Sequence, residues 1–187
     1  MAKVGDNIVT TGLRGKLGNL IVFRNYGGKT IVSMAPKRKK TQRTETQEKY
    51  LQRFKEAVLY AQNAIADKVT KDAYQNSAQE GRSAYNVAVA DFLNAPRINE
   101  IDVSHYNGRP GSYLQIHAID DFMVKDVSVT IRNADGTEIE NGMAIQQPGA
   151  IWWRYTATTV NPSLNGSIII VRVSDLPGNL TGKITEL

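Results

Sequence analysis

The sequence lacks several residues on which common catalytic and metal sites depend. It contains no cysteine, so it can form neither a disulfide framework nor a thiolate nucleophile or metal site. Its histidines, His105 and His117, lie on different expected elements with no HExxH arrangement, which argues against a zinc site. No GxSxG nucleophile elbow is present. These absences predict a protein that is not an enzyme, with no catalytic, cofactor-binding or metal residues assigned and no cofactor or small-molecule substrate indicated.

Long apolar runs are also lacking. No stretch approaches the ~18 apolar residues of a membrane-spanning helix, and residues 1–16 contain no sustained apolar segment of the signal-peptide type. We therefore expect no membrane span, and synthesis in the cytoplasm without a signal peptide.

Acidic residues are scarce at the N-terminal end. Residues 1–44 contain ten Lys/Arg against one Asp, a net charge of +9. Residues 45–96 contain six basic and seven acidic residues, a net of −1, and residues 97–187 contain seven and ten, a net of −3. Such a basic arm can bind nucleic acid, another anionic surface, or the acidic remainder of its own assembly. The residues predicted to contact a polyanion or acidic partner are Lys37, Arg38, Lys39, Lys40 and Arg43.

The arm also contains the pattern of a β-hairpin. Two apolar segments, residues 18–24 and 30–34, flank a turn sequence at residues 25–28, whereas residues 1–14 are expected to be irregular. A hairpin is marginally stable by itself, so its apolar residues must be covered by the rest of the chain or by a neighbouring copy. We predict an oligomer contact formed by Leu20, Ile21, Val22, Phe23, Ile31, Val32 and Met34.

Helical and then strand patterns follow the arm. Thr44 and Gln47 have capping-box spacing before a helix expected to run to about residue 67, with an apolar stripe formed by Leu51, Phe54, Val58, Ala61 and Ile65. Further helices are expected near residues 70–79 and 83–94. From residue 97 the apolar period changes to two, which predicts about seven short strands. The expected fold is α+β: an N-terminal hairpin arm (1–43), a three-helix region (44–96) and an immunoglobulin-like or fibronectin-like β-sandwich (97–187).

Two features of the expected sandwich leave binding functions open. Trp152 or Trp153 should anchor its core, and the other tryptophan can be exposed for a carbohydrate. Four carboxylates, Asp120, Asp121, Asp126 and Asp175, can gather at one end as calcium ligands, although their spacing matches no defined calcium loop. Acidic turn residues are also common for purely local reasons.

Several short motifs resemble a group of small uncharacterised proteins of Bacteroidota and their phages. The motifs are Gly15, Lys16 and Gly18 in the hairpin, Pro36 after it, the trio Ala84, Tyr85 and Asn86, and the sandwich segments NADG (133–136) and LPGN (176–179). The resemblance implies a phage-like or mobile-element structural protein, which can be part of a virion or another extracellular assembly. It supplies no catalytic residues.

Three functional hypotheses remain. The first is a non-enzymatic assembly subunit that associates with its own copies into a ring or filament through the N-terminal arm. The second is a nucleic-acid-binding protein that uses the basic arm. The third is a carbohydrate-binding or adhesion sandwich.

Overall fold

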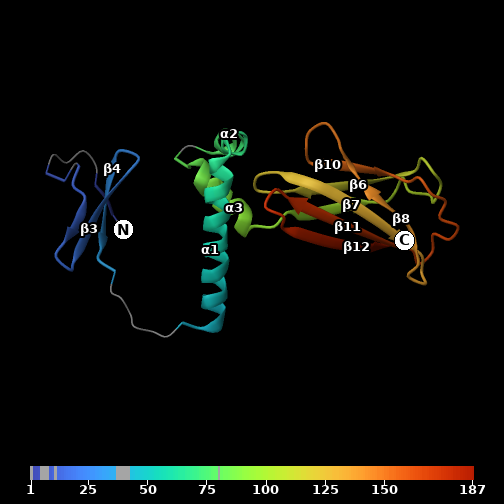
Figure 1. The fold of residues 1–187 in the computed structure, drawn as a ribbon, viewed down its shortest axis with the longest axis horizontal. Coiled ribbons are helices and arrows are strands. Elements are labelled where there is room, and N and C mark those ends of the chain that lie inside the picture. Colours follow the sequence, from blue (N-terminus) through green and yellow to red (C-terminus); the bar gives the residue numbers. More distant parts are fainter. Residues whose placement is uncertain (1, 5–8, 11, 37–42, 80) are drawn as a thin grey trace. The chain divides into compact units, whose positions relative to one another are not determined.

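A computed structural model of the chain describes residues 2–4, 9–10, 12–36, 43–79 and 81–187. The chain divides into two compact units, Met1–Glu48 and Lys49–Leu187 (Figure 1). Four of the five predicted polyanion contacts, Lys37 to Lys40, lie outside the described residues, and Arg43 is exposed. The domain boundaries expected at residues 43/44 and 96/97 stay predictions.

The first unit is a four-stranded antiparallel sheet. Its strands are β1 (Ala2–Val4), β2 (Gly15–Leu17), β3 (Ile21–Tyr26) and β4 (Lys29–Met34), in the order β1-β4-β3-β2. The predicted hairpin is confirmed as β3–β4. Gly27 and Gly28 connect it with φ of 55° and 73°, the left-handed backbone that a two-residue hairpin turn requires. The expectation that residues 1–14 are irregular is wrong at β1, which pairs with β4.

Three helices follow the sheet: α1 (Glu45–Ala66), whose first turn falls in the first unit, and α2 (Lys68–Ser77) and α3 (Ala84–Leu93) in the second. The capping box of α1 is confirmed, because Thr44 and Gln47 exchange backbone-to-side-chain hydrogen bonds of 3.2 and 3.3 Å. Ser83 caps α3. The buried side of α1 is formed by Ala57 and Ala61, whereas Phe54 of the expected apolar stripe is 49% exposed.

Helices and sandwich share a core. Tyr74 is fully buried among Ala61, Ala84 and Ala88, and Phe122 and Leu176 pack against this cluster. Phe122 lies in a sandwich turn at residues 120–123, and its ring centroid lies 4.2 Å from that of Tyr74. The helical core is therefore completed by sandwich residues.

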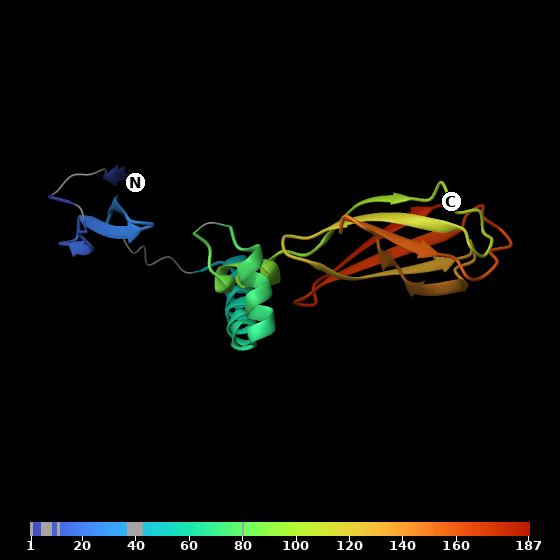
Figure 2. The ribbon, with the colours of Figure 1, turned by 90° about the horizontal axis from the view of Figure 1, so that it is seen from above.

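The sandwich has two antiparallel sheets in two layers (Figure 2). One has the order β5-β6-β10-β9 and the other β12-β11-β7-β8. This is the ABED and GFCC′ arrangement of immunoglobulin-like sandwiches, so the expected fold class is confirmed. The strands are β5 (Arg97–Asp102), β6 (Tyr113–Ile119), β7 (Val124–Arg132), β8 (Glu138–Met143), β9 (Ile145–Gln146), β10 (Trp152–Thr156), β11 (Ile168–Asp175) and β12 (Leu180–Glu186).

Period-two alternation supplies the core between the sheets. Along β6, buried residues alternate with partly exposed ones, and β7 and β11 repeat the pattern. Trp153 is 6% exposed and belongs to this core, as expected for one of the two tryptophans. Among the described helices, none is long and apolar enough to cross a membrane.

Candidate functional site

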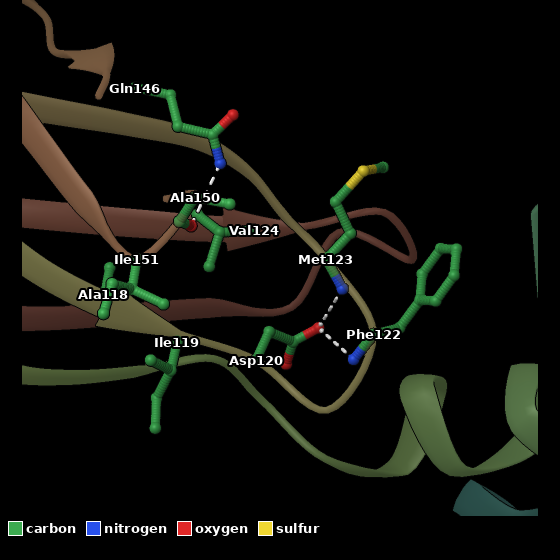
Figure 3. A pocket seen from close by; sticks show the side chains of 9 residues that line it. All are labelled: Ala118, Ile119, Asp120, Phe122, Met123, Val124, Gln146, Ala150 and Ile151. Carbon is green, nitrogen blue, oxygen red and sulfur yellow. Dashed lines mark hydrogen bonds between the residues drawn. The ribbon is translucent and has the colours of Figure 1, made fainter. Parts of the chain in front are cut away.

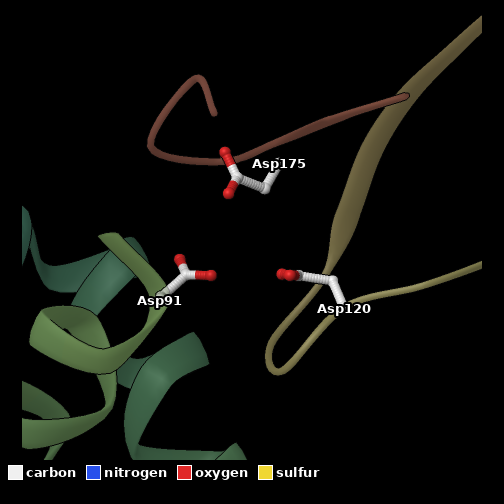
Figure 4. A group of neighbouring side chains, drawn as sticks. All are labelled: Asp91, Asp120 and Asp175. Atoms are coloured by element: carbon white, nitrogen blue, oxygen red, sulfur yellow. The ribbon is translucent and has the colours of Figure 1, made fainter. Parts of the chain in front are cut away.

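Three carboxylates meet where the helices contact the sandwich. Asp91 comes from α3, Asp120 follows β6, and Asp175 ends β11; each offers an oxygen atom within 4.8 Å of the other two (Figure 4). Asp91 and Asp175 are each 1% exposed, whereas Asp120 is half-buried. We call these three residues the aspartate cluster.

Two sandwich turns hold two of these carboxylates in place. Asp120 Oδ2 accepts hydrogen bonds from the backbone N–H groups of Phe122 and Met123, at 3.3 and 3.1 Å. Asp175 Oδ1 accepts from the N–H groups of Gly178 and Asn179, at 2.8 and 2.6 Å. Each aspartate thus shapes the turn that positions it.

Asn179 joins the second of these turns to α3. Its Nδ2 group donates to Asp175 Oδ2 at 2.7 Å and also lies 3.1 to 3.3 Å from the backbone oxygens of Asp91, Phe92 and Asn94. Carbonyls in the last turn of a helix lack intrahelical donors, so an amide side chain there satisfies them. The same side chain therefore orients both a cluster carboxylate and the end of α3.

The environment of Asp91 disfavours its charge. Burial raises the pKa of Asp91 to about 7; the hydrogen bond from the Tyr74 hydroxyl, at 2.5 Å, opposes this rise, and the negative charges of Asp120 and Asp175 add to it. The Tyr74 and Tyr60 hydroxyls lie 2.8 Å apart, and burial raises the pKa of both. Asp91 Oδ1 and Asp120 Oδ1 are both buried without a hydrogen-bond partner.

Two pockets of about 230 Å³ lie beside the cluster. One is largely apolar, with Asp120 at its edge and Ile119, Met123 and Ile151 among its lining residues (Figure 3). The other is lined by Asp91 and Asp121 together with Arg82 and Gln79. Each pocket touches one carboxylate of the cluster, so the cluster is bordered by space on two sides.

The sequence pointed to part of this cluster. Of the four carboxylates considered for calcium, Asp120 and Asp175 come together. Asp121 instead accepts a hydrogen bond of 2.7 Å from Asn94, and Asp126 lies within β7 opposite Ser174. Asp91 was missed because it lies in α3, and helical periodicity gives no signal of which sandwich turn faces a helix residue.

The tryptophan and histidine candidates are not among the residues of the aspartate cluster. Trp152 is half-buried, and its ring stacks on His117 with centroids 4.9 Å apart. His105 stacks on Tyr113 at 4.7 Å. Both histidines therefore pack against aromatic rings of the sandwich.

The strand register divides the N-terminal sheet into two unlike faces. Cross-strand partners share a face, because side chains alternate along each strand. One face, here called the apolar face, carries Leu17, Ile21, Phe23, Val32 and Met34. The other, called the basic face, carries Lys16, Val22, Arg24, Lys29, Ile31 and Ser33.

The predicted oligomer-contact residues are divided between these faces. Ile21, Phe23, Val32 and Met34 share the apolar face, Val22 and Ile31 lie on the basic face, and Leu20 lies in the turn before β3. Met34 is 82% exposed and Leu17 65% exposed. Within residues 9–10 and 12–36, Thr30 alone is buried. The described part of this sheet therefore has no core of its own.

No protein-family model and no curated protein matches the chain. The solved structures that resemble part of it include the following two. The crystal structure of CopC from Methylosinus trichosporium OB3b is 14% identical with a TM-score of 0.36, covering 48% of this chain and 87% of that chain. An engineered protein is 12% identical with a TM-score of 0.33, covering 58% of this chain and 30% of that chain. Likeness at this level carries no functional argument.

Proposed function

We propose that the protein is a non-enzymatic structural subunit, phage-like or derived from a mobile element, that associates with its own copies through the N-terminal sheet. The observation that supports this most is the incompletely covered apolar face, on which Leu17 and Met34 are exposed and Ile21, Phe23 and Val32 are only half-buried. A sheet that exposes Leu17 and Met34 on one face, and buries only Thr30 among its described residues, needs a second layer to be stable.

A second copy of the chain suits this role for two reasons. The outer strands β1 and β2 leave backbone groups available for pairing with another strand. The charges are also complementary: residues 1–44 have a net charge of +9, whereas residues 97–187 have a net of −3. Contacts between unlike surfaces of successive copies build a closed ring or an open filament.

Helix α1 offers a receiving surface on such a neighbour. Tyr50 and Phe54 lie four residues apart, so they share one face of the helix, and they are 71% and 49% exposed. Large apolar side chains gathered on an exposed face mark interaction surfaces.

Light scattering and analytical ultracentrifugation of the full chain over a range of concentrations test the proposal. The matched variants are Met34→Asp and Ser33→Asp, which introduce the same charge at adjacent positions on opposite faces of β4. We expect wild type and Ser33→Asp to associate. Met34→Asp should need a protein concentration at least about 10-fold higher, a difference of about 1.4 kcal/mol, because its unpaired carboxylate would be buried in the contact.

A wild-type protein that stays a monodisperse monomer at high concentration would exclude assembly through this sheet. Equal weakening by both variants would show a nonspecific charge effect and would exclude the apolar face as the contact.

The basic face supports nucleic-acid binding as the second candidate. Lys16, Arg24 and Lys29 are exposed on one side of the sheet, and the basic run at residues 37–40 follows in the sequence. Fluorescence anisotropy with duplex DNA should then show binding that weakens steeply with salt and is lost when residues 37–40 are replaced by alanine. Binding that ignores salt, or that survives this replacement, would reject this candidate.

A further inference from the structure

When all three carboxyl groups of the aspartate cluster are ionised, two of their buried oxygens have no hydrogen donor. They are Oδ1 of Asp91, whose side chain is 1% exposed, and Oδ1 of Asp120. Figure 4 shows the carboxylates of Asp91, Asp120 and Asp175 directed toward a common space. Burying a carboxylate oxygen without a partner is costly, so such atoms normally have one.

We propose that Asp91, Asp120 and Asp175 bind one hard divalent cation, with Ca²⁺ as the best match. Carboxylate oxygens are the ligands that Ca²⁺, Mg²⁺ and Mn²⁺ prefer, and the cluster contains neither the thiolates nor the imidazoles that favour zinc. The inference is independent of the proposed self-association.

The ligand set suits Ca²⁺ better than Mg²⁺. Ca²⁺ accepts about 6–8 oxygen ligands at about 2.3–2.6 Å in a flexible geometry, whereas Mg²⁺ requires a near-ideal octahedron and usually keeps several waters beside one or two carboxylates. The three ligand atoms lie within 4.8 Å of one another, so one ion can approach all three carboxylates. Water can complete its coordination.

The charge balance points the same way. The charges that act on Asp91 are those of Asp120 and Asp175, both negative. Asp175 accepts its hydrogen bonds from backbone and amide groups, which are neutral, and its Oδ2 atom, which accepts one bond, retains a lone pair for an ion. A divalent cation would offset two of the three negative charges and give both unpartnered oxygens a ligand role.

Binding there would connect parts of the chain that are distant in sequence. Asp91 lies in α3, Asp120 in the β6–β7 turn and Asp175 beside the β11–β12 turn. The ion would hold the helices on the end of the sandwich, alongside the contact between Tyr74 and Phe122. Its expected role is structural, and the readout is therefore stability.

Calorimetric titration and thermal unfolding of the full chain, freed of metal with EDTA and buffer-exchanged, test the proposal with CaCl₂ and, separately, MgCl₂. We expect saturable Ca²⁺ binding and a rise in Tm of about 5–10 °C at 100 times the Kd, with a smaller response to Mg²⁺. Asp91→Asn and Asp120→Asn should reduce the Ca²⁺ affinity at least about 10-fold.

Asp121→Asn is the matched control, because it removes a neighbouring carboxylate that is outside the cluster and bonded to Asn94. It should keep the wild-type response. Absence of Ca²⁺ binding by wild type at millimolar concentrations would overturn the proposal, and Asp91 and Asp120 would then share a proton. A Ca²⁺ response unchanged in both cluster variants would also overturn it, because the ion would bind elsewhere.

Discussion

At the residue scale, Asp91 is almost fully buried. Its carboxyl group must therefore be either protonated or balanced by a positive charge. Its pKa is raised by burial to about 7, above the ordinary value of 3.8 that applies in the unfolded chain. Between these values the folded state holds a proton that the unfolded state has released, so stability falls as pH rises. The groups facing Asp91 are Tyr60, Tyr74, Asp120 and Asp175, with Arg82 and Asp121 along the adjoining pocket.

Replacing Asp91 by Asn should therefore flatten the pH dependence of stability. In EDTA, the free energy of unfolding of wild type should decline between about pH 4 and pH 8 by more than that of Asp91→Asn, because the variant has no proton to lose. Urea unfolding at several pH values measures this difference, with Asp121→Asn as the control. Parallel profiles for wild type and Asp91→Asn would show that Asp91 titrates as an ordinary carboxyl group.

At the element scale, the β11–β12 turn links the sandwich to the end of α3 through Asn179. Replacing Asn179 by Ala leaves a cluster carboxylate and the last carbonyls of α3 without their amide donor. We expect a loss of about 1–3 kcal/mol in the free energy of unfolding, measured by urea denaturation. Asn133→Ala, in a turn remote from the helices, serves as the comparison, and an equally small effect of both would contradict a linking role.

Helices and strands with a periodic or capping pattern in their own sequence could be predicted. Very short strands, which form only because they pair with a neighbouring strand, could not. Alternation identified β6, β7 and β11, and the capping box identified the start of α1. Strand β1 spans only Ala2–Val4, and β9 only Ile145–Gln146, too short for any periodicity. Phe54 was misplaced because α1 contacts the rest of its unit through the small residues Ala57 and Ala61. Two of the three residues of the aspartate cluster, Asp120 and Asp175, were anticipated, since turn carboxylates are visible in sequence whereas their helix partner Asp91 is not.

At the scale of the whole molecule, the two units differ in how complete they are. Both clusters of buried apolar residues lie within Lys49–Leu187. A fragment of residues 44–187, which retains the capping box, should fold with the far-UV and near-UV circular dichroism expected of its helices and buried aromatic residues. It should remain monomeric where the full chain associates. Association of this fragment at the full-chain concentration would place the assembly contact in the second unit.

The two unlike faces of the N-terminal sheet limit which changes in chain length its strands can accept. Because Ser33 and Met34 are neighbours in β4 yet serve opposite faces, inserting or deleting one residue within the strand would exchange the faces for every position beyond it. Substitutions by residues of similar polarity, or insertions and deletions of two residues, leave each side chain on its original face of the sheet. Variation among relatives of this protein should therefore follow even-numbered steps within β3 and β4, with odd-numbered changes confined to the turns.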